Sequence, residues 1–346
     1  MKRVVLATAL ACVAMSASAD VTVYGRVDTG LLYAHDAKGD VVSMESGIAG
    51  AARLGFKGTE KISDNLKVGF VLEASLKDDT GAAFEAGFDR EAALYVYTPY
   101  GDLRIGRSGA LGGGSNGGIF GGLVSPFGTV YKNAASTQIH VQEERFNNQV
   151  RYDSPVMGGL KLMAQYANGG ANTKYDTATE KKVIDDDTSR QNRYAAVGAS
   201  YKVGGLNMVA VYDRVYKKGD NNDAKYAKIG ASYKVDNVTF FAGYQHAENA
   251  AVGKSKLKSA DSDSVTFGTR VAVAGGDLNM GFGYAKGEKN GSEAEIVQAA
   301  VGYTFALSKR TTLYAAGTYL DTKYEAVTDA VDGSVKQVMA GLYHTF

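Results

Sequence analysis

The chain has 346 residues, and its 38 Lys and Arg residues nearly balance its 37 Asp and Glu residues, for a formal net charge of +1. This balance gives no reason to expect nucleic acid as a partner. Cysteine occurs once, at Cys12, so the chain has no internal disulfide and no cluster of thiolate ligands, and we expect no metal and no cofactor.

Residues 1–19 have the pattern of a secretory signal peptide, in which two basic residues precede an apolar run and small residues form the cleavage pattern at its end. We therefore expect the mature protein to begin at Asp20 and to form one barrel domain over residues 20–346. A lipid-modified Cys12 is the alternative, but Ala9 stands where a bulky aliphatic residue is usual.

Beyond this segment, apolar and polar residues alternate with a period of two through most of the chain. Every second residue from Leu66 to Leu76 is apolar, for example, while Lys67 and Glu73 lie on the other parity. Such alternation predicts strands with one apolar and one polar face, and no stretch approaches the roughly 18 uncharged apolar residues of a membrane helix. We count sixteen such segments, among them residues 21–35, 238–247, 265–273, 278–286, 294–305 and 335–346.

The connections between these segments alternate in length. The short ones lie at residues 60–65, 99–102, 154–159, 203–205, 235–237, 274–276 and 306–310. The long ones lie at residues 36–48, 77–88, 109–138, 168–188, 217–223, 248–263, 287–293 and 323–334. Short periplasmic turns and longer external loops are typical of outer-membrane barrels. The sequence therefore predicts an all-β fold, a 16-stranded antiparallel transmembrane β-barrel. A soluble β-sandwich or solenoid would also show alternating apolar and polar residues, but its short and long connections would not alternate in this way.

The same period of two gives each arginine in a strand a direction. In the segment 145–153, two arginines lie on the face opposite the apolar residues, so we expect them to point into the lumen. The test turns five arginines inward: Arg26, Arg53, Arg104, Arg145 and Arg151. It leaves Arg90 undecided, because both faces of the next segment are apolar, and it places Tyr95 and Tyr97 on the lipid side or at the membrane interface.

Four segments carry recognisable motifs. They are residues 23–28 (VYGRVD), 53–60 (RLGFKGTE), 145–155 (RFNNQVRYDSP) and the ending 341–346 (GLYHTF). In this order they resemble the general porins of Gram-negative bacteria, especially the betaproteobacterial branch, and the resemblance covers the whole mature chain. It implies a homotrimer in the lipid of the outer membrane that passes small hydrophilic solutes, including inorganic or small organic anions, by diffusion. It also implies that the third loop narrows the lumen and that the terminal Phe346 is the assembly signal.

The resemblance also implies which residues line the constriction. In the enterobacterial general porins, basic residues of the first, second, fourth and sixth strands line it, and the matching residues here are Arg26, Arg53, Arg90 and Arg145. The segment 109–138 matches the constriction loop, and its Ser125-Pro126-Phe127-Gly128 is similar to the family's Pro-Glu-Phe-Gly without the acidic residue.

The charges of this loop bear on selectivity. Residues 109–138 contain no Asp or Glu, and their one basic residue is Lys132. Arginines that face such a loop would create a positive field, which predicts a preference for anions. The alternative is that each arginine pairs with a carboxylate such as Asp28 or Glu73 and only supports the wall.

Other classes of function have weaker support. The histidines are His35, His140, His246 and His344, and their positions show neither metal-ligand spacing nor a nucleophile beside them, so we expect no catalysis. Glycines at 112, 114 and 117 match the spacing of a dinucleotide-binding loop, but no helical pattern follows them. A substrate-specific channel, which would show aromatic residues in its lumen, and an adhesin acting through its external loops remain the alternatives on the same barrel.

Overall fold

The computed structural model describes residues 21–83, 87–141, 143, 145–169, 173–176, 181–184, 192–219 and 222–346. The expected signal peptide, residues 1–19, and the expected mature start at Asp20 lie outside the described residues and stay predictions. Among the described residues, no helix combines the length and the apolar character needed to cross a bilayer.

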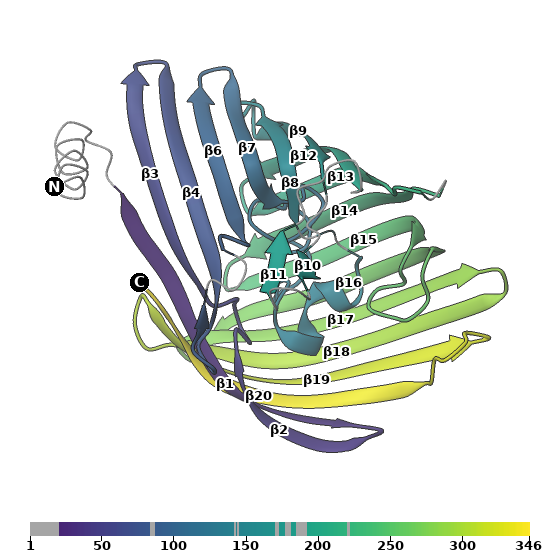
Figure 1. Cartoon of the computed structure of the whole chain (residues 1–346). Coiled ribbons are helices and arrows are strands. Elements are labelled where there is room, and N and C mark those ends of the chain that lie inside the picture. The colour runs from purple at the N-terminus through teal and green to yellow at the C-terminus, as the bar shows by residue number, and fades with distance from the viewer. Residues whose placement is uncertain are drawn as a thin grey trace, which may run out of the picture.

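Eighteen of the described strands form one large antiparallel sheet. Two of these strands are short additions to the wall: β2 (Gly39–Ser46) pairs with β1, and β5 (Ala82–Ala83) pairs with the end of β4. The other sixteen strands form a closed wall (Figure 1), because the last strand pairs with the first. These are β1 (Thr22–Asp36), β3 (Arg53–Ser63), β4 (Leu66–Lys77), β6 (Glu91–Thr98), β7 (Gly101–Gly109), β8 (Arg145–Asp153), β9 (Leu160–Asn168), β12 (Arg193–Val203), β13 (Leu206–Tyr216), β14 (Ala224–Val235), β15 (Val238–Ala250), β16 (Ala260–Val273), β17 (Gly276–Lys289), β18 (Ser292–Ala306), β19 (Thr311–Glu325) and β20 (Gly333–Thr345). The predicted 16-stranded antiparallel barrel is confirmed.

The wall has the two faces that the alternation predicted. Large apolar side chains point outward, among them Phe267, which is 57% exposed, and Val338, which is 61% exposed. Polar side chains such as Gln165, Thr266 and Gln298 point inward and are buried. Because their exposed sides are apolar, the outward faces suit lipid, while the inward faces offer hydrogen-bonding groups to whatever fills the lumen.

Three of the predicted long connections contain strands. Residues 39–46 form β2, which pairs with the second half of β1, whereas β3 pairs with its first half. The assignment of these residues to a loop was wrong, because Val42 and Met44 still alternate with Ser43 and Glu45 in the period-two pattern of a strand. The second case is the segment 77–88, where β5 pairs with the end of β4, and the third is the segment 168–188, where β10 (Thr173–Asp176) and β11 (Lys181–Ile184) pair in a separate sheet.

The predicted third loop lies inside the barrel. It connects β7 to β8 and contains two short 3-10 helices, η1 (Lys132–Ala134) and η2 (Ser136–Gln138). Its apolar side chains Phe120, Val124 and Ile139 have no exposed surface. The loop therefore packs against the inner wall as part of the folded core, as predicted.

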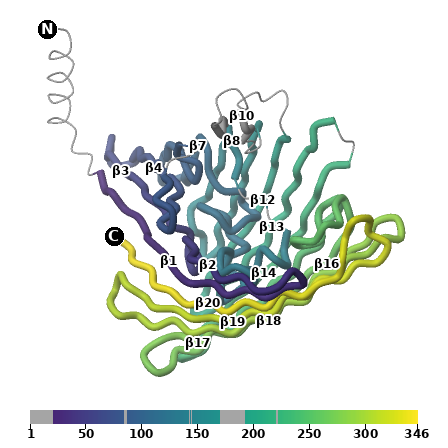
Figure 2. The backbone as a smooth tube through the Cα atoms, turned by 60° about the horizontal axis from the view of Figure 1, so that its bottom comes forward, coloured from purple at the N-terminus to yellow at the C-terminus, as the bar shows by residue number. Residues whose placement is uncertain are grey.

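The two ends of the chain meet where the wall closes. Figure 2 shows β20 running beside β1 up to the C-terminus. Gly25 N donates to Phe346 O over 3.1 Å, and Phe346 N donates to Gly25 O over 3.2 Å. The terminal residue thus supplies the last two backbone hydrogen bonds of the closing seam.

Deletion of Phe346 should reduce insertion into the outer membrane without reducing synthesis. It leaves the N–H and C=O groups of Gly25 without these partners, and a buried backbone group without a partner costs about 1–3 kcal/mol. Heat-modifiable protein in outer-membrane fractions measures the effect on gels. Phe346→Tyr, which keeps the backbone and an aromatic ring, should assemble normally; a truncated chain at normal yield would contradict the role given to the seam.

Candidate pore constriction

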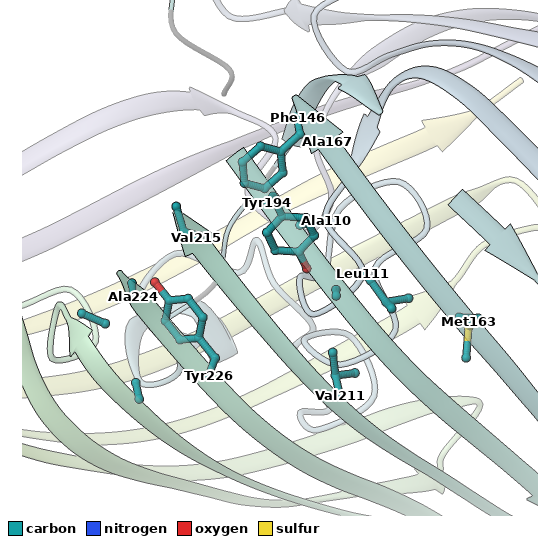
Figure 3. Packing of buried hydrophobic residues seen from close by; sticks show 13 residues of the cluster. Ala110, Leu111, Phe146, Met163, Ala167, Tyr194, Val211, Val215, Ala224 and Tyr226 are labelled. Atoms are coloured by element: carbon teal, nitrogen blue, oxygen red, sulfur yellow. The ribbon is translucent and has the colours of Figure 1, made fainter. Parts of the chain in front are cut away.

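The third loop is attached first to the wall formed by β9, β12, β13 and β14. Leu111 N donates to Gln165 Oε1 over 2.6 Å, Gly112 N donates to Tyr194 Oη over 3.2 Å, and Lys228 Nζ donates to Gly112 O over 2.9 Å. The apolar residues beside these bonds pack together, and Figure 3 shows Leu111 beside the ring of Tyr194. Both backbone groups of Gly112 are therefore held by the wall.

A buried ion pair lies under this attachment. Lys228 Nζ is 3.1 Å from Asp213 Oδ1, both side chains are fully buried, and Tyr194 Oη donates to Asp213 Oδ2 over 3.2 Å. A Cβ atom at residue 112 would stand 2.6 Å from Asp213 Oδ2, so glycine is needed for the loop to reach this cluster. The cluster fixes the start of the loop at one place on the wall.

The middle of the loop, which includes the predicted Pro126-Phe127-Gly128 segment, lies on β16, β17 and β18. Arg270 Nη2 donates to Pro126 O over 2.6 Å. A Cβ at Gly268 would stand 2.5 Å from Pro126 Cδ, and one at Gly302 would stand 3.0 Å from Phe127 Cε1. Glycines of the wall thus provide the space in which Pro126 and Phe127 pack.

His140, near the end of the loop, binds two hydroxyl groups of β16. Its Nδ1 is 2.8 Å from Ser264 Oγ and its Nε2 is 2.9 Å from Thr266 Oγ1. Burial, with a smaller contribution from the charge of Lys228, lowers the pKa of His140 to about 3. Because Thr266 donates its hydroxyl proton to Val124 O, the neutral ring donates from Nε2 to Thr266. His140 is therefore a neutral structural contact, and among the described residues the hydrogen-bond partners of its ring are hydroxyl groups rather than a carboxylate that would orient it as a catalytic base.

The tip of the loop reaches the opposite side of the barrel. Lys132 Nζ is 2.8 Å from Glu45 Oε2 of β2, and Asn133 N donates to Gln337 Oε1 of β20 over 3.2 Å. The ring of Tyr131 packs on Tyr314, with centroids 5.8 Å apart. The loop thus spans the lumen from β9 to β20, and the charge of Lys132 is paired rather than free.

The remaining side of the lumen carries the arginines that the sequence singled out. Arg90 Nε donates to Glu73 Oε1 over 2.7 Å, and Arg53 Nε is 3.5 Å from Glu73 Oε2. Arg145 Nε donates to the carbonyl oxygen of Arg90 over 3.0 Å. The fold therefore brings Arg53 and Arg90 together around one carboxylate and sets Arg145 beside Arg90, although Arg90 lies just before β6 rather than within it.

Arg26 joins this group through the sheet register, which sets it opposite Arg53. Its guanidinium carbon is 4.5 Å from the centre of the Tyr343 ring, and its Nε makes no hydrogen bond with any described residue. The carboxylate of Asp28 accepts hydrogen bonds from three other groups, which are Ala49 N, Gly50 N and Tyr314 Oη. Pairing between arginine and carboxylate, the alternative to a role in the pore, thus applies to Arg53 and Arg90, whose partner is Glu73, and to Arg151, whose partner is Asp153. Asp28 is not such a partner.

Sequence reasoning missed Asn116, which lies in the loop beside these arginines. Its Nδ2 donates to Glu73 Oε1 and to Glu91 Oε2, both over 2.9 Å. Its Oδ1 accepts from Arg90 Nη2 at 3.5 Å and from Arg145 Nη2 at 3.4 Å. The period-two test does not apply to loop residues and an uncharged side chain draws no attention, so no signal in the sequence pointed to it.

The predicted outward position of Tyr95 and Tyr97 is wrong. Leu94, next to Tyr95 and on the other parity, is 57% exposed on the outer face. Tyr95 Oη donates to Glu91, and the guanidinium carbon of Arg104 lies 4.9 Å from the centre of the Tyr95 ring. Both faces of β6 are apolar in sequence, so the period-two test could not show which face points into the lumen. The contacts of Tyr95 with Glu91 and Arg104 show that its face is the inner one.

Replacing Lys228 with methionine should destabilise the barrel and loosen the loop. The change leaves the carboxylate of Asp213 buried without its cation, and removing one partner of a buried pair costs about 3–5 kcal/mol. The temperature at which the folded, heat-modifiable form disappears from gels should fall. The current noise of the open channel should rise.

The double variant Lys228→Met/Asp213→Leu should recover much of this loss, because no buried charge remains. Lys225→Met is the matched control on the same strand: its partner Glu248 is 41% exposed, so the effect should stay within about 1 kcal/mol. Equal losses in the single and double variants at residue 228 would show that the buried pair does not hold the loop.

Comparison with known proteins places this architecture in a family. Residues 5–325 match the family model described as Gram-negative porin. The chain is 27% identical to the major outer membrane protein P.IB of Neisseria meningitidis, over 100% of both chains.

Its fold is similar to that of an anion-selective porin from Comamonas acidovorans, with a TM-score of 0.69 and 24% identity over 95% of this chain and 100% of that one. It is also similar to the trimer form of the outer membrane protein OmpT of Vibrio cholerae, with a TM-score of 0.67 and 18% identity over 95% of this chain and 99% of that one. The closed sixteen-stranded wall, the loop in its lumen and the family match agree, and the chain belongs to the Gram-negative porins as a diffusion pore of the outer membrane.

Proposed function

We propose that the pore prefers small anions to cations and that four arginines face its narrowest part. These are Arg26, Arg53, Arg90 and Arg145. The observation that carries the proposal is a difference in exposure: the side chain of Arg53 is 29% exposed, whereas that of Glu73, which binds it, is 6% exposed. Water in the pore therefore meets the guanidinium before it meets the carboxylate.

The other carboxylates on this side are also turned into the wall. Asp28 has no exposed surface and Glu91 is 6% exposed. Glu91 accepts from Ser108 Oγ and from the side chains of Tyr95 and Asn116. Carboxylates that accept several hydrogen bonds at fixed positions have little tendency to rotate toward water. The cations on this side thus contribute more to the field in the pore than the anions do.

The loop across the lumen supports the same preference. Its most exposed residues are Gly117, Gly122 and Val130, which carry no charge, and its lysine is paired with Glu45. Charges on distant external loops are screened, because the Debye length is about 10 Å at 0.1 M salt. The fold is also similar to that of a Comamonas porin whose name records anion selectivity.

We also propose that the pore is a homotrimer embedded in outer-membrane lipid. The likeness to a porin solved in a trimer form supports this assembly. Exposed apolar residues on one face of β2, Val42 and Met44, give an outward surface that a neighbouring subunit or lipid would cover. In planar-bilayer recordings, a trimer with one pore in each subunit should close in three equal steps, whereas single-step closure would contradict it.

The native protein should show a zero-current potential that favours chloride in a KCl gradient, and this preference should weaken as salt rises. Replacing Arg53 and Arg145 together with serine should shift the permeability ratio toward potassium by roughly fivefold or more, because each charge interacts with a nearby ion by about 1 kcal/mol in water. Conductance for large ions should also increase, since two bulky side chains are lost.

A matched control removes two arginines that are exposed elsewhere on the barrel, Arg193 and Arg310. The variant Arg193→Ser/Arg310→Ser has the same change in net charge and should keep the native selectivity. A native protein that favours potassium at low salt would overturn the proposed preference.

A further inference from the structure

We propose that Asn116 is a positioning residue for ion selectivity, whose side-chain amide holds Glu73 and Glu91 in the wall and thereby keeps carboxylates out of the pore. This inference rests on the proposed preference for anions. It concerns a loop residue without charge, which the family motifs in this sequence do not include.

The partners of Asn116 determine how its amide is oriented. Carboxylates such as Glu73 and Glu91 only accept hydrogen bonds, whereas the guanidinium groups of Arg90 and Arg145 only donate them. Only the NH₂ group can therefore face the two carboxylates, and only the carbonyl oxygen can face the two arginines. Among uncharged side chains, an amide alone offers two donors and an acceptor in this geometry, so Asn116 serves groups of both signs at once.

The backbone of Asn116 is held as firmly as its side chain. Its carbonyl oxygen accepts from Arg104 Nη1 at 3.0 Å. The carbonyl oxygen of Gly117 accepts from Arg151 Nη1 at 2.5 Å. Asn116 has a φ of 30°, a left-handed conformation that asparagine adopts more readily than most residues. The amide is thus presented to the wall from a fixed position rather than from a mobile loop.

Loss of this amide would affect the two carboxylates differently. Glu73 keeps its contacts with Arg53, Arg90 and the hydroxyl of Tyr24. Among the described residues, the side-chain donors that Glu91 keeps are two hydroxyl groups, those of Ser108 and Tyr95. A nearly buried carboxylate that loses a donor recovers that hydrogen bond by turning toward water. We therefore expect Glu91 to move toward the pore and to add negative charge there, although the net charge of the protein does not change.

Asn116→Gly tests this inference, because glycine removes the amide and adopts the positive φ without strain. Full-length protein purified from outer membranes is reconstituted in planar bilayers, and the zero-current potential is measured in a KCl gradient. The permeability ratio of chloride to potassium should fall by roughly fivefold, which corresponds to about 1 kcal/mol. Asn133→Gly is the matched control in the same loop: the side chain of Asn133 makes no hydrogen bond with the described residues, so selectivity should stay native.

A second variant separates positioning from general damage to the loop. In Asn116→Gly/Glu91→Gln an uncharged amide replaces the carboxylate that would turn toward the pore. The preference for chloride should therefore return to the native ratio or exceed it. Native selectivity in Asn116→Gly, or no recovery in the double variant, would overturn the inference. If the glycine variant does not assemble, Asn116→Ser, which keeps one donor, is measured instead and should shift the ratio in the same direction by a smaller factor.

The outcomes also separate this inference from the proposed function. The sign of the native zero-current potential tests the preference for anions, and the difference between native protein and Asn116→Gly tests the role of Asn116. A potassium-preferring native pore would contradict the proposed function, while a further shift toward potassium in the glycine variant would still support the positioning role.

Discussion

The structure depends on one constraint, which is that every backbone N–H and C=O group facing lipid needs a partner within the protein. The pairing of β20 with β1 meets this constraint by closing the sheet, and the closed sheet divides the side chains into an outer and an inner set. Because the outer set must be apolar, the hydrogen-bonding side chains are collected on the inner face. That face then anchors the third loop through groups such as Gln165, Lys228 and Arg270.

The charges in the lumen follow from how this inner face is used. Positive and negative side chains lie close together around Glu73, so their number alone does not set the selectivity. Their exposure does, because the carboxylates of Asp28, Glu73 and Glu91 are buried and receive several hydrogen bonds within the wall, while Arg26 and Arg53 are partly exposed. A porin can therefore present a cationic surface to its pore while it keeps the carboxylates that hold its arginines in place.

The sequence predicted the barrel and the loop well, since strand period and connection length are local properties that lipid and water impose directly. It also predicted the inward direction of Arg53 and Arg145, because their strands have one clearly apolar face. It could not predict the pairing of Lys132 with Glu45, which joins residues far apart in the chain, or the direction of Tyr95, whose strand is apolar on both faces. Asn116 was missed because its importance comes only from the groups around it.

The central claim is that guanidinium groups, and not the carboxylates behind them, face the ions in the pore. Crystals of the native protein soaked in rubidium bromide test it most directly, because anomalous scattering distinguishes the two ions. We expect bromide beside Arg26 and Arg53, with no rubidium between these residues and the loop. Rubidium bound at Glu73 or Glu91, without bromide at the arginines, would contradict it.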